Sequence, residues 1–291
     1  MLIPFIVPAA ALLAGISNRA RASRKVSLEY AGRFHFDANG VADGAQGFRL
    51  EGTNGKALLL LHGSGDTPQS LRYLAERLHS AGFTVVAPLL PGHGRSPYAF
   101  SKATSSEYHA EVERVHAHLR ETFEWVGLVG LSMGGALATF AASRTPRVPL
   151  LVLLAPYFIP PDDIQWVKRL SWAWSWAAPY LRGRGESSVH DVIASGESRA
   201  YGSFSAGALS ALVSTASDGR RAIPALDLPI LVVNSETDNR ITRIAAEQAL
   251  GEFRAPVEAH WVSGCGHVIT VDFCKARVAD LVLDFLARHA G

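Results

Sequence analysis

Residues 130–134 read Gly-Leu-Ser-Met-Gly, and this G-x-S-x-G pattern constrains the fold more than any other part of the chain. An apolar run at 126–129, expected as a buried strand, precedes it, and small residues at 133–143, expected as a helix, follow it. Glycines at both ends let strand and helix turn sharply and approach closely. In that setting Ser132 stands exposed at the end of a sheet as a nucleophile, while a serine that only caps a helix is the alternative.

The composition is that of an ordinary globular protein. The chain has 291 residues, of which 48% are hydrophobic and 19% charged, so intrinsic disorder is excluded as the main state. The formal net charge is +2 and no basic stripe interleaves with aromatic residues, so no nucleic-acid partner is expected. The two cysteines, Cys265 and Cys274, exclude a disulfide scaffold and a Cys-rich zinc site. A disulfide between them is an alternative, but two free thiols are expected.

Strand-like and helix-like segments alternate along most of the chain. Short apolar runs are typical of strands buried on both faces of a sheet, and helix-length segments separate them. This alternation predicts an α/β fold with a mostly parallel sheet flanked by helices. The expected strands are 26–36, 47–50, 57–61, 84–90, 126–129, 150–154, 230–233 and 259–262. The expected helices are 69–80, 105–123, 133–143, 242–253 and 275–290.

Residues 156–225 break this alternation. The stretch holds helix-like pieces rich in Trp and Ala and is too long for a simple connection in a compact domain. We interpret it as a helical cap inserted into a core formed by 26–155 and 226–291.

The cap carries four of the six tryptophans, and on a helix Trp172 and Trp176 share one face. Plain packing within the cap is one interpretation of this apolar helix. The other is an acyl-binding wall or a surface that touches lipid, because Trp favours membrane interfaces. Tyr157 and Phe158 follow the strand at 150–154 and are expected to border the same substrate pocket.

The N-terminal residues 1–25 are set apart from the core. Residues 2–16 are apolar and uncharged, but a membrane span needs about 20 residues, and no basic residue precedes the run as in a signal peptide. Four cations between residues 19 and 25 follow it. A membrane-associating anchor is favoured, and a cleaved signal or a disordered or spurious tail are the alternatives. The compartment stays open between membrane, cytoplasm and export.

A serine hydroxyl becomes nucleophilic when a base, usually a histidine held by a carboxylate, removes its proton. In this architecture the acid and then the histidine follow the serine along the chain. His267 stands in a Gly-rich loop after the last strand, where a base can overhang the sheet. The other histidines after Ser132 have simpler interpretations. His190 lies in the cap, His260 in a strand where core packing is expected, and His289 at a helix end.

The acid is expected in the loop that follows the strand at 230–233. Asp238 and Glu236 both lie there, and the residues alone favour Asp238 without excluding Glu236. Asp227 precedes the strand and therefore lies at the wrong end of the sheet.

Negative charge on a reacting carbonyl oxygen needs preorganised N–H donors, which form an oxyanion hole. The N–H of Met133 is one candidate, and the N–H of Ser64, in the loop after the first core strand, is the other. His62 is expected to be structural and to bond nearby backbone. His93 is expected to be a structural loop residue, because no His or Cys at ligand spacing suggests a metal.

Five segments together resemble the α/β-hydrolase fold family, and the likeness spans residues 57–290. It is closest to small bacterial carboxylesterases and monoacylglycerol lipases, which are serine hydrolases. Residues 60–63 resemble the oxyanion strand and loop of that family, 88–96 resemble its P-x-x-x-G-H-G-x-S segment, and 130–135 resemble its nucleophile turn. Residues 235–241 resemble its acid loop, and 264–272 resemble its histidine loop.

The resemblance assigns Ser132 as nucleophile, Asp238 as orienting acid and His267 as base, and places Ser64 and Met133 in the oxyanion hole. It implies cleavage of a carboxylic ester such as a monoacylglycerol through an acyl-enzyme, with no cofactor and no metal. The chain departs from these esterases at Ser64, where a bulky apolar residue often also lines the acyl pocket. The cap sequence matches no single member.

Other activities use the same three groups, since a fold does not fix a function. An acyltransferase, a thioesterase, an aminopeptidase and a carbon–carbon-bond hydrolase are alternatives. A non-catalytic ligand-binding or membrane-scaffold protein is an alternative of another class, as is a membrane-interaction module led by residues 1–25. The sequence favours catalysis because all three triad positions are filled.

Overall fold

A seven-stranded sheet runs through the molecule in this computed structural model, which describes residues 6–182 and 187–290. The strands lie in the order β1-β3-β2-β4-β5-β8-β9, and all neighbours are parallel except β1 and β3. Their bounds are β1 Phe48–Leu50, β2 Lys56–Leu61, β3 Thr84–Ala87, β4 Trp125–Leu131, β5 Leu151–Leu154, β8 Ile230–Ser235 and β9 Val257–Val262. The predicted mostly parallel α/β sheet is therefore confirmed.

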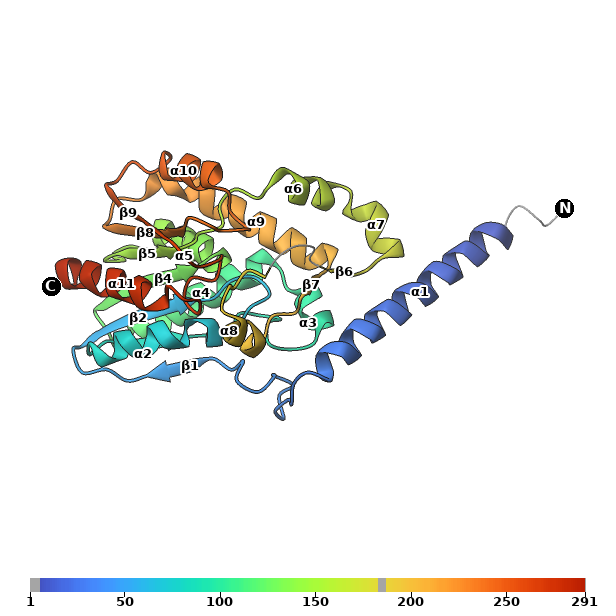
Figure 1. Ribbon diagram of the computed structural model, residues 1–291, viewed down its shortest axis with the longest axis horizontal. Coiled ribbons are helices and arrows are strands. Elements are labelled where there is room, and N and C mark those ends of the chain that lie inside the picture. Colours follow the sequence, from blue (N-terminus) through green and yellow to red (C-terminus); the bar gives the residue numbers. More distant parts are fainter. Residues whose placement is uncertain (1–5, 183–186, 291) are drawn as a thin grey trace.

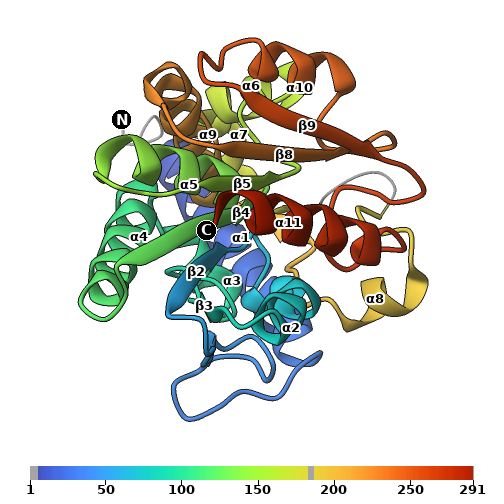
Figure 2. The same cartoon turned by 90° about the vertical axis from the view of Figure 1, so that its left-hand side faces the viewer.

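Helices cover both faces of the sheet (Figures 1 and 2). On one face lie α2 (Arg72–Ser80) and α11 (Lys275–His289), which contact each other. On the other lie α4 (Ser105–Arg120), α5 (Met133–Arg144) and α9 (Ala206–Ala222). The remaining helices of this core are the short α3 (Pro97–Lys102) and α10 (Arg243–Leu250).

The alternation of side chains along β2 explains the two-layered core. Leu58 and Leu60 pack with the apolar side chains of α2 and α11, whereas Leu59 and Leu61 pack with those of α4 and α5. All four are fully buried. Burial of each such side chain contributes about 1.5–3 kcal/mol, so the apolar run holds β2 in the interior of the sheet, between β3 and β4.

Over its described residues, 156–182 and 187–225, the segment predicted as a cap contains three short α-helices and one long α-helix. These are α6 (Asp162–Arg169), α7 (Ser171–Ala177), α8 (Val192–Glu197) and α9, joined by a short strand pair of β6 (Leu181–Arg182) and β7 (Ser203–Phe204). The helix α9 lies so close to α5 that a Cβ added to Gly219 would be 2.6 Å from the Ala136 carbonyl oxygen. The C-terminal part of this segment thus also covers the sheet, and the extent of the cap stays a prediction.

The prediction of a strand at 26–36 was wrong. The helix α1 runs over Ile6–Ala31 and projects from the body as an arm (Figure 1). Its less exposed residues, among them Gly15, Val26 and Tyr30, recur at helical spacing along the side that meets the body. Tyr30 is buried with its ring 4.7 Å from that of Tyr201, which anchors the helix end. Among the residues described, none of the helices has the length and hydropathy that crossing a membrane requires.

The expectation of two free thiols was also wrong. Cys265 and Cys274 form a disulfide with their Cα atoms 5.8 Å apart. The chain between them folds back over the carboxyl end of the sheet and brings the two side chains together, which a spacing of nine residues does not reveal. The bond closes the loop that carries His267.

Replacing both cysteines by serine should lower the free energy of unfolding by about 2–3 kcal/mol, because the bridge restricts the unfolded chain. Urea unfolding of the oxidised protein and of Cys265→Ser/Cys274→Ser measures the difference. The wild type under reducing conditions is the control and should match the double variant. Equal stability of reduced and oxidised wild type would contradict this role of the disulfide.

Candidate active site

Ser132 lies in a strained turn between β4 and α5. Its φ is +55° and its ψ −118°, a conformation that side-chain-bearing residues rarely adopt and that is concentrated at functional sites. The flanking glycines are needed for space. A Cβ on Gly134 would lie 2.1 Å from the Leu61 carbonyl oxygen, and one on Gly130 would lie 2.2 Å from the Gly134 carbonyl oxygen. The pattern at 130–134 therefore forms the turn that the sequence predicts.

Three predicted side chains meet at the carboxyl end of the sheet. His267 Nε2 lies 2.8 Å from Ser132 Oγ, and His267 Nδ1 lies 2.7 Å from Asp238 Oδ2. Because a carboxylate only accepts, Nδ1–H donates to Asp238, which leaves Nε2 to accept the Ser132 hydroxyl. Asp238 follows β8 and His267 follows the adjacent strand β9, so the parallel register places their loops side by side. Ser132 is 9% and His267 7% exposed.

Asp238, not Glu236, is the carboxylate that meets the histidine. Its other oxygen accepts the backbone N–H groups of Arg240 at 2.7 Å and Ile241 at 2.8 Å. Burial acts to raise the pKa of Asp238, but the hydrogen bond and charge of His267 and these N–H groups outweigh burial and hold the pKa below its usual value. Glu236 is exposed.

The loop after β2 runs beside the nucleophile. A Cβ on Gly63 would lie 3.3 Å from the Cβ and 3.8 Å from the Oγ of Ser132, so the backbone at Gly63 passes close to this hydroxyl. Ser64 follows directly, and Met133 is the first residue of α5, where helix N–H groups have no partner within the helix. That the backbone N–H groups of Ser64 and Met133 act as oxyanion donors stays a prediction.

The histidines His62 and His93 bond backbone, as expected of structural residues. The Nδ1 of His62 donates to the Gly63 carbonyl at 2.9 Å, and its Nε2 accepts the Leu90 N–H at 3.1 Å. Burial, aided by His93, holds the pKa of His62 well below its usual value, and burial lowers the pKa of His93 to about 4. His93 Nδ1 bonds the Pro91 carbonyl at 3.0 Å.

The residues predicted to line the substrate pocket are spread over the cap and its root. The backbone N–H of Tyr157 donates to the Ser132 carbonyl at 3.1 Å, which places Tyr157 beside the turn between β4 and α5. Phe158 is 2% exposed and packs against Phe253 in the core. Trp172 and Trp176, on α7, are 79% and 43% exposed. Their part in a pocket stays a prediction.

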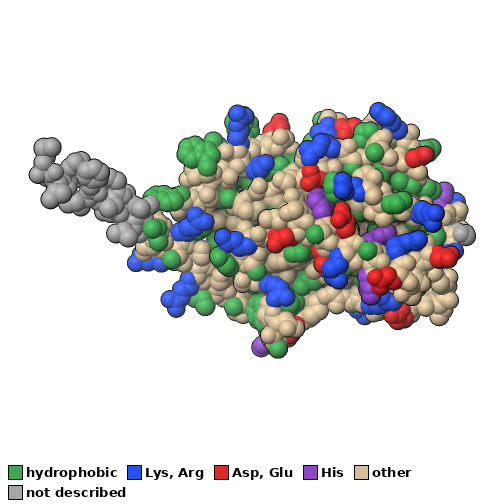
Figure 3. All heavy atoms as spheres, turned by 180° about the vertical axis from the view of Figure 1, so that it is seen from behind, with side chains coloured by type: hydrophobic (Ala, Val, Ile, Leu, Met, Phe, Trp, Pro, Cys, Tyr) green, Lys and Arg blue, Asp and Glu red, His purple; other side chains and the backbone are tan. Residues whose placement is uncertain are grey.

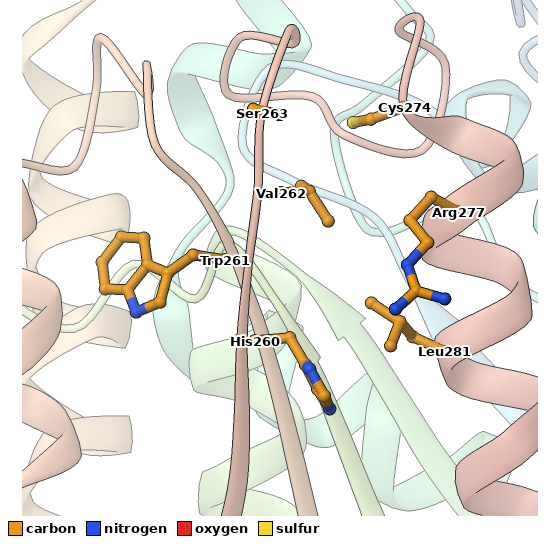
Figure 4. A pocket seen from close by; sticks show the side chains of 7 residues that line it. All are labelled: His260, Trp261, Val262, Ser263, Cys274, Arg277 and Leu281. Atoms are coloured by element: carbon orange, nitrogen blue, oxygen red, sulfur yellow. The ribbon is translucent and has the colours of Figure 1, made fainter.

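His260 does not pack in the core as predicted. It lies on β9, an edge strand of the sheet, where it is partly exposed and its Nε2 is 2.8 Å from Glu258 Oε1. It borders a cavity of about 330 Å³ between β9 and α11, which Trp261, Arg277 and Cys274 also line (Figure 4). None of Ser132, Asp238 and His267 lines this cavity. Within the described ranges, no group of three or more His, Cys, Asp or Glu side chains is arranged to hold a metal ion.

Asp66 is a titratable neighbour of the site that the sequence did not single out. It ends the loop at 62–66, and burial raises the pKa of its carboxyl to about 6, although the Ser70 hydroxyl, the Thr67 N–H and the charge of His267 act in the opposite direction. An acidic residue in the loop after the first core strand was visible in the sequence. Its desolvation depends on packing and was not.

At pH 7.5 Asp66→Asn should have a higher free energy of unfolding than the wild type, on the order of 1 kcal/mol after screening by solvent, because the buried charge is removed. At pH 4, where the carboxyl is protonated, this gain should be absent. The folded-state pKa is raised, so the carboxyl favours folding below about pH 4 and loses that contribution as pH rises to about 6. Urea unfolding at pH 4, 6 and 7.5 measures this, with Asp284→Asn, an exposed acid on α11, as control. Parallel curves for Asp66→Asn and wild type would contradict a raised pKa.

The comparisons with known proteins agree with this geometry. A thermostable monoacylglycerol lipase of Bacillus sp. (strain H-257) is 27% identical over 253 residues, which cover 86% of this chain and 98% of the lipase. A carboxylesterase of Bacillus subtilis (strain 168) is 25% identical over 235 residues, which cover 80% of this chain and 93% of the esterase. A solved structure from work on the metagenome-derived lipolytic enzymes LipS and LipT has a TM-score of 0.78 and 27% identity, covering 86% of this chain and 100% of that chain.

The family match covers most of the fold. Residues 52–273 match the family Hydrolase_4, described as serine aminopeptidase, S33. This range begins before β2 and ends after the histidine loop, so it includes the turn at Ser132 and the loops of Asp238 and His267. The chain therefore belongs to the serine aminopeptidase S33 family of α/β-hydrolases.

Proposed function

We propose that the protein hydrolyses carboxylic esters through an acyl-enzyme on Ser132. The observation that carries this proposal is the continuous pair of hydrogen bonds from Asp238 through His267 to Ser132, at 2.7 and 2.8 Å. A serine in hydrogen-bond contact with an oriented imidazole is the arrangement that nucleophilic acyl transfer needs. The lipase and carboxylesterase among the relatives support an ester rather than an amide as the scissile group.

Acylation uses each of these contacts. The Ser132 oxygen attacks the ester carbonyl carbon while Nε2 of His267 takes the hydroxyl proton, and the ionised Asp238 stabilises the imidazolium that forms. The N–H groups of Ser64 and Met133 receive the negative charge on the carbonyl oxygen, where one such donor is worth about 3–4 kcal/mol of barrier. Collapse of the tetrahedral intermediate breaks the bond to the alcohol, which leaves with the proton from His267.

Deacylation repeats the sequence with water. His267 removes a proton from a water molecule, whose oxygen attacks the acyl carbonyl, and the proton then returns to Ser132 as the acid leaves. No cofactor enters either half. The substrate is a small acyl ester, and the lipase among the relatives favours a monoacylglycerol.

Ser132→Ala should lower kcat/KM for p-nitrophenyl butyrate and for a medium-chain monoacylglycerol by at least about 10⁴-fold, because the nucleophile is lost. Ser80→Ala, on an exposed face of α2, is the matched control and should keep full activity. An aminoacyl p-nitroanilide should be a poor substrate of the wild type. Turnover of the esters by Ser132→Ala at the wild-type rate, or preference for the anilide, would contradict the proposal.

We also propose that α1 and α7 together form a lipid-binding surface. The two helices contact each other, and Ile16, Trp172 and Trp176 on them are 54%, 79% and 43% exposed. Four exposed cations follow Ile16 on α1, namely Arg19, Arg21, Arg24 and Lys25. At the end of the molecule that carries the arm, Figure 3 shows hydrophobic and basic side chains side by side, with acidic ones mainly on the other half of that face. Trp and basic residues together favour an anionic bilayer surface.

Trp172→Ser/Trp176→Ser should reduce binding to vesicles of phosphatidylcholine and phosphatidylglycerol by about 10-fold or more, because exposed indoles supply apolar contact at the interface. Sedimentation of the full chain with vesicles measures the bound fraction. Vesicles of phosphatidylcholine alone should bind the wild type more weakly, since they lack the charge. Equal binding by the double variant and wild type would refute a role for α7.

A further inference from the structure

The carboxylate of Asp272 is fully buried and is held by four backbone N–H groups. Oδ2 accepts from His190 at 2.8 Å and from Gly266 at 2.7 Å, and Oδ1 accepts from Asp191 and Phe273, both at 2.9 Å. Over residues 6–182 and 187–290, no Lys, Arg or His forms an ion pair with it. A buried charge without a counter-ion is costly, and these N–H groups are what compensates it.

The four donors come from two parts of the chain that are far apart in sequence. Gly266 immediately precedes His267, whereas His190 and Asp191 lead into α8, in the segment predicted as a cap. A second bond runs parallel to this bridge, from the Val268 N–H to the Ser188 carbonyl at 3.1 Å. The loop of His267 and the chain at 188–191 are therefore joined on both sides of the histidine.

The fit between these two segments is close. A Cβ added to Gly266 would be 2.6 Å from the Ser188 carbonyl oxygen, so the backbones touch directly at this point. On the opposite side of the loop, the hydroxyls of Ser235 and Thr237 both donate to the Cys265 carbonyl. The backbone just before His267 is thus clamped between the end of β8 and the chain at 188–191, with Asp272 supplying the acceptor on one side.

We propose that Asp272 is a positioning residue that fixes the imidazole of His267 by tying its loop to the chain at 188–191. This inference rests on the proposed function for its kinetic consequences only. Burial acts to raise the pKa of Asp272, but the four N–H bonds outweigh it and keep the pKa below its usual value, so the acceptor is charged at neutral pH. A shift of about 1 Å in a catalytic group can cost about 100-fold in rate, which gives such a clamp its effect.

Asp272→Asn is the decisive variant, because it keeps the shape of the side chain but leaves one acceptor oxygen and turns an NH₂ group toward backbone donors. It should lower kcat by about 10- to 100-fold per active site counted by fluorophosphonate titration, with KM changed less than about threefold. The loss should be equal for p-nitrophenyl acetate and p-nitrophenyl decanoate, because the residue acts through His267 and not through contact with the acyl chain. Asp272→Glu keeps the charge and should recover part of kcat.

A spectroscopic readout separates this inference from the proposed function. The low-field proton resonance of His267 Nδ1–H reports its bond to Asp238 whether or not the protein cleaves esters, and it should broaden or shift in Asp272→Asn but not in the control Asp284→Asn. If the wild type does not cleave esters but the resonance is displaced in Asp272→Asn, the proposed esterase activity is contradicted and the positioning role of Asp272 is supported. An active wild type with kcat and resonance unchanged in Asp272→Asn, or a loss confined to KM for the decanoate, would overturn the clamp.

Discussion

The structure depends on how closely α5 approaches the sheet behind Ser132. No side chain fits at Gly130 or Gly134, and the serine between them is held at φ +55° because the chain must reverse within a single residue. The strain is offset by the packing on both sides of the turn, where β2 and β4 are buried throughout most of their length. A loose core would let this residue relax to an ordinary conformation, and the hydroxyl would leave the position that His267 reaches.

The sequence predicted the parts of the fold that follow from periodicity. The apolar runs of β2, β4, β5 and β8 are buried on both faces, so their pattern alone identified them. The prediction of a strand at 26–36 was wrong because Val26, Leu28 and Tyr30 alternate with polar residues as in a strand. In the helix α1 Tyr30 is buried against the body, whereas Leu28 is 61% exposed. The prediction that His260 packs in the core was wrong because an edge strand exposes side chains that a central strand would bury.

The site shows the same division between local and long-range information. Ser132 and His267 were visible as motifs, and the loop of Asp238 followed from chain order. The residues alone favoured Asp238 over Glu236 and the family resemblance assigned it, and the geometry agrees, since Asp238 is the carboxylate that contacts His267. The disulfide, the desolvation of Asp66 and the four donors around Asp272 arise from contacts between distant segments, which spacing does not encode. Chemistry carried by a short motif is therefore predictable here, whereas the groups that tune and hold it need the folded chain.

The buried histidines His62 and His93 make the stability of the folded protein depend on pH. In the unfolded chain both imidazoles take up protons near pH 6.5, but in the folded protein the pKa of His93 is about 4 and that of His62 is depressed as well. Between those pKa values a fall in pH lowers the free energy of unfolding, because the unfolded state binds more protons at these two imidazoles. The single carboxyl of Asp66 has a raised pKa and changes the stability in the opposite direction. Acidification from pH 6.5 toward pH 4 therefore works against the folded state through two imidazoles that are packed beside the loop at 62–66 and the nucleophile turn.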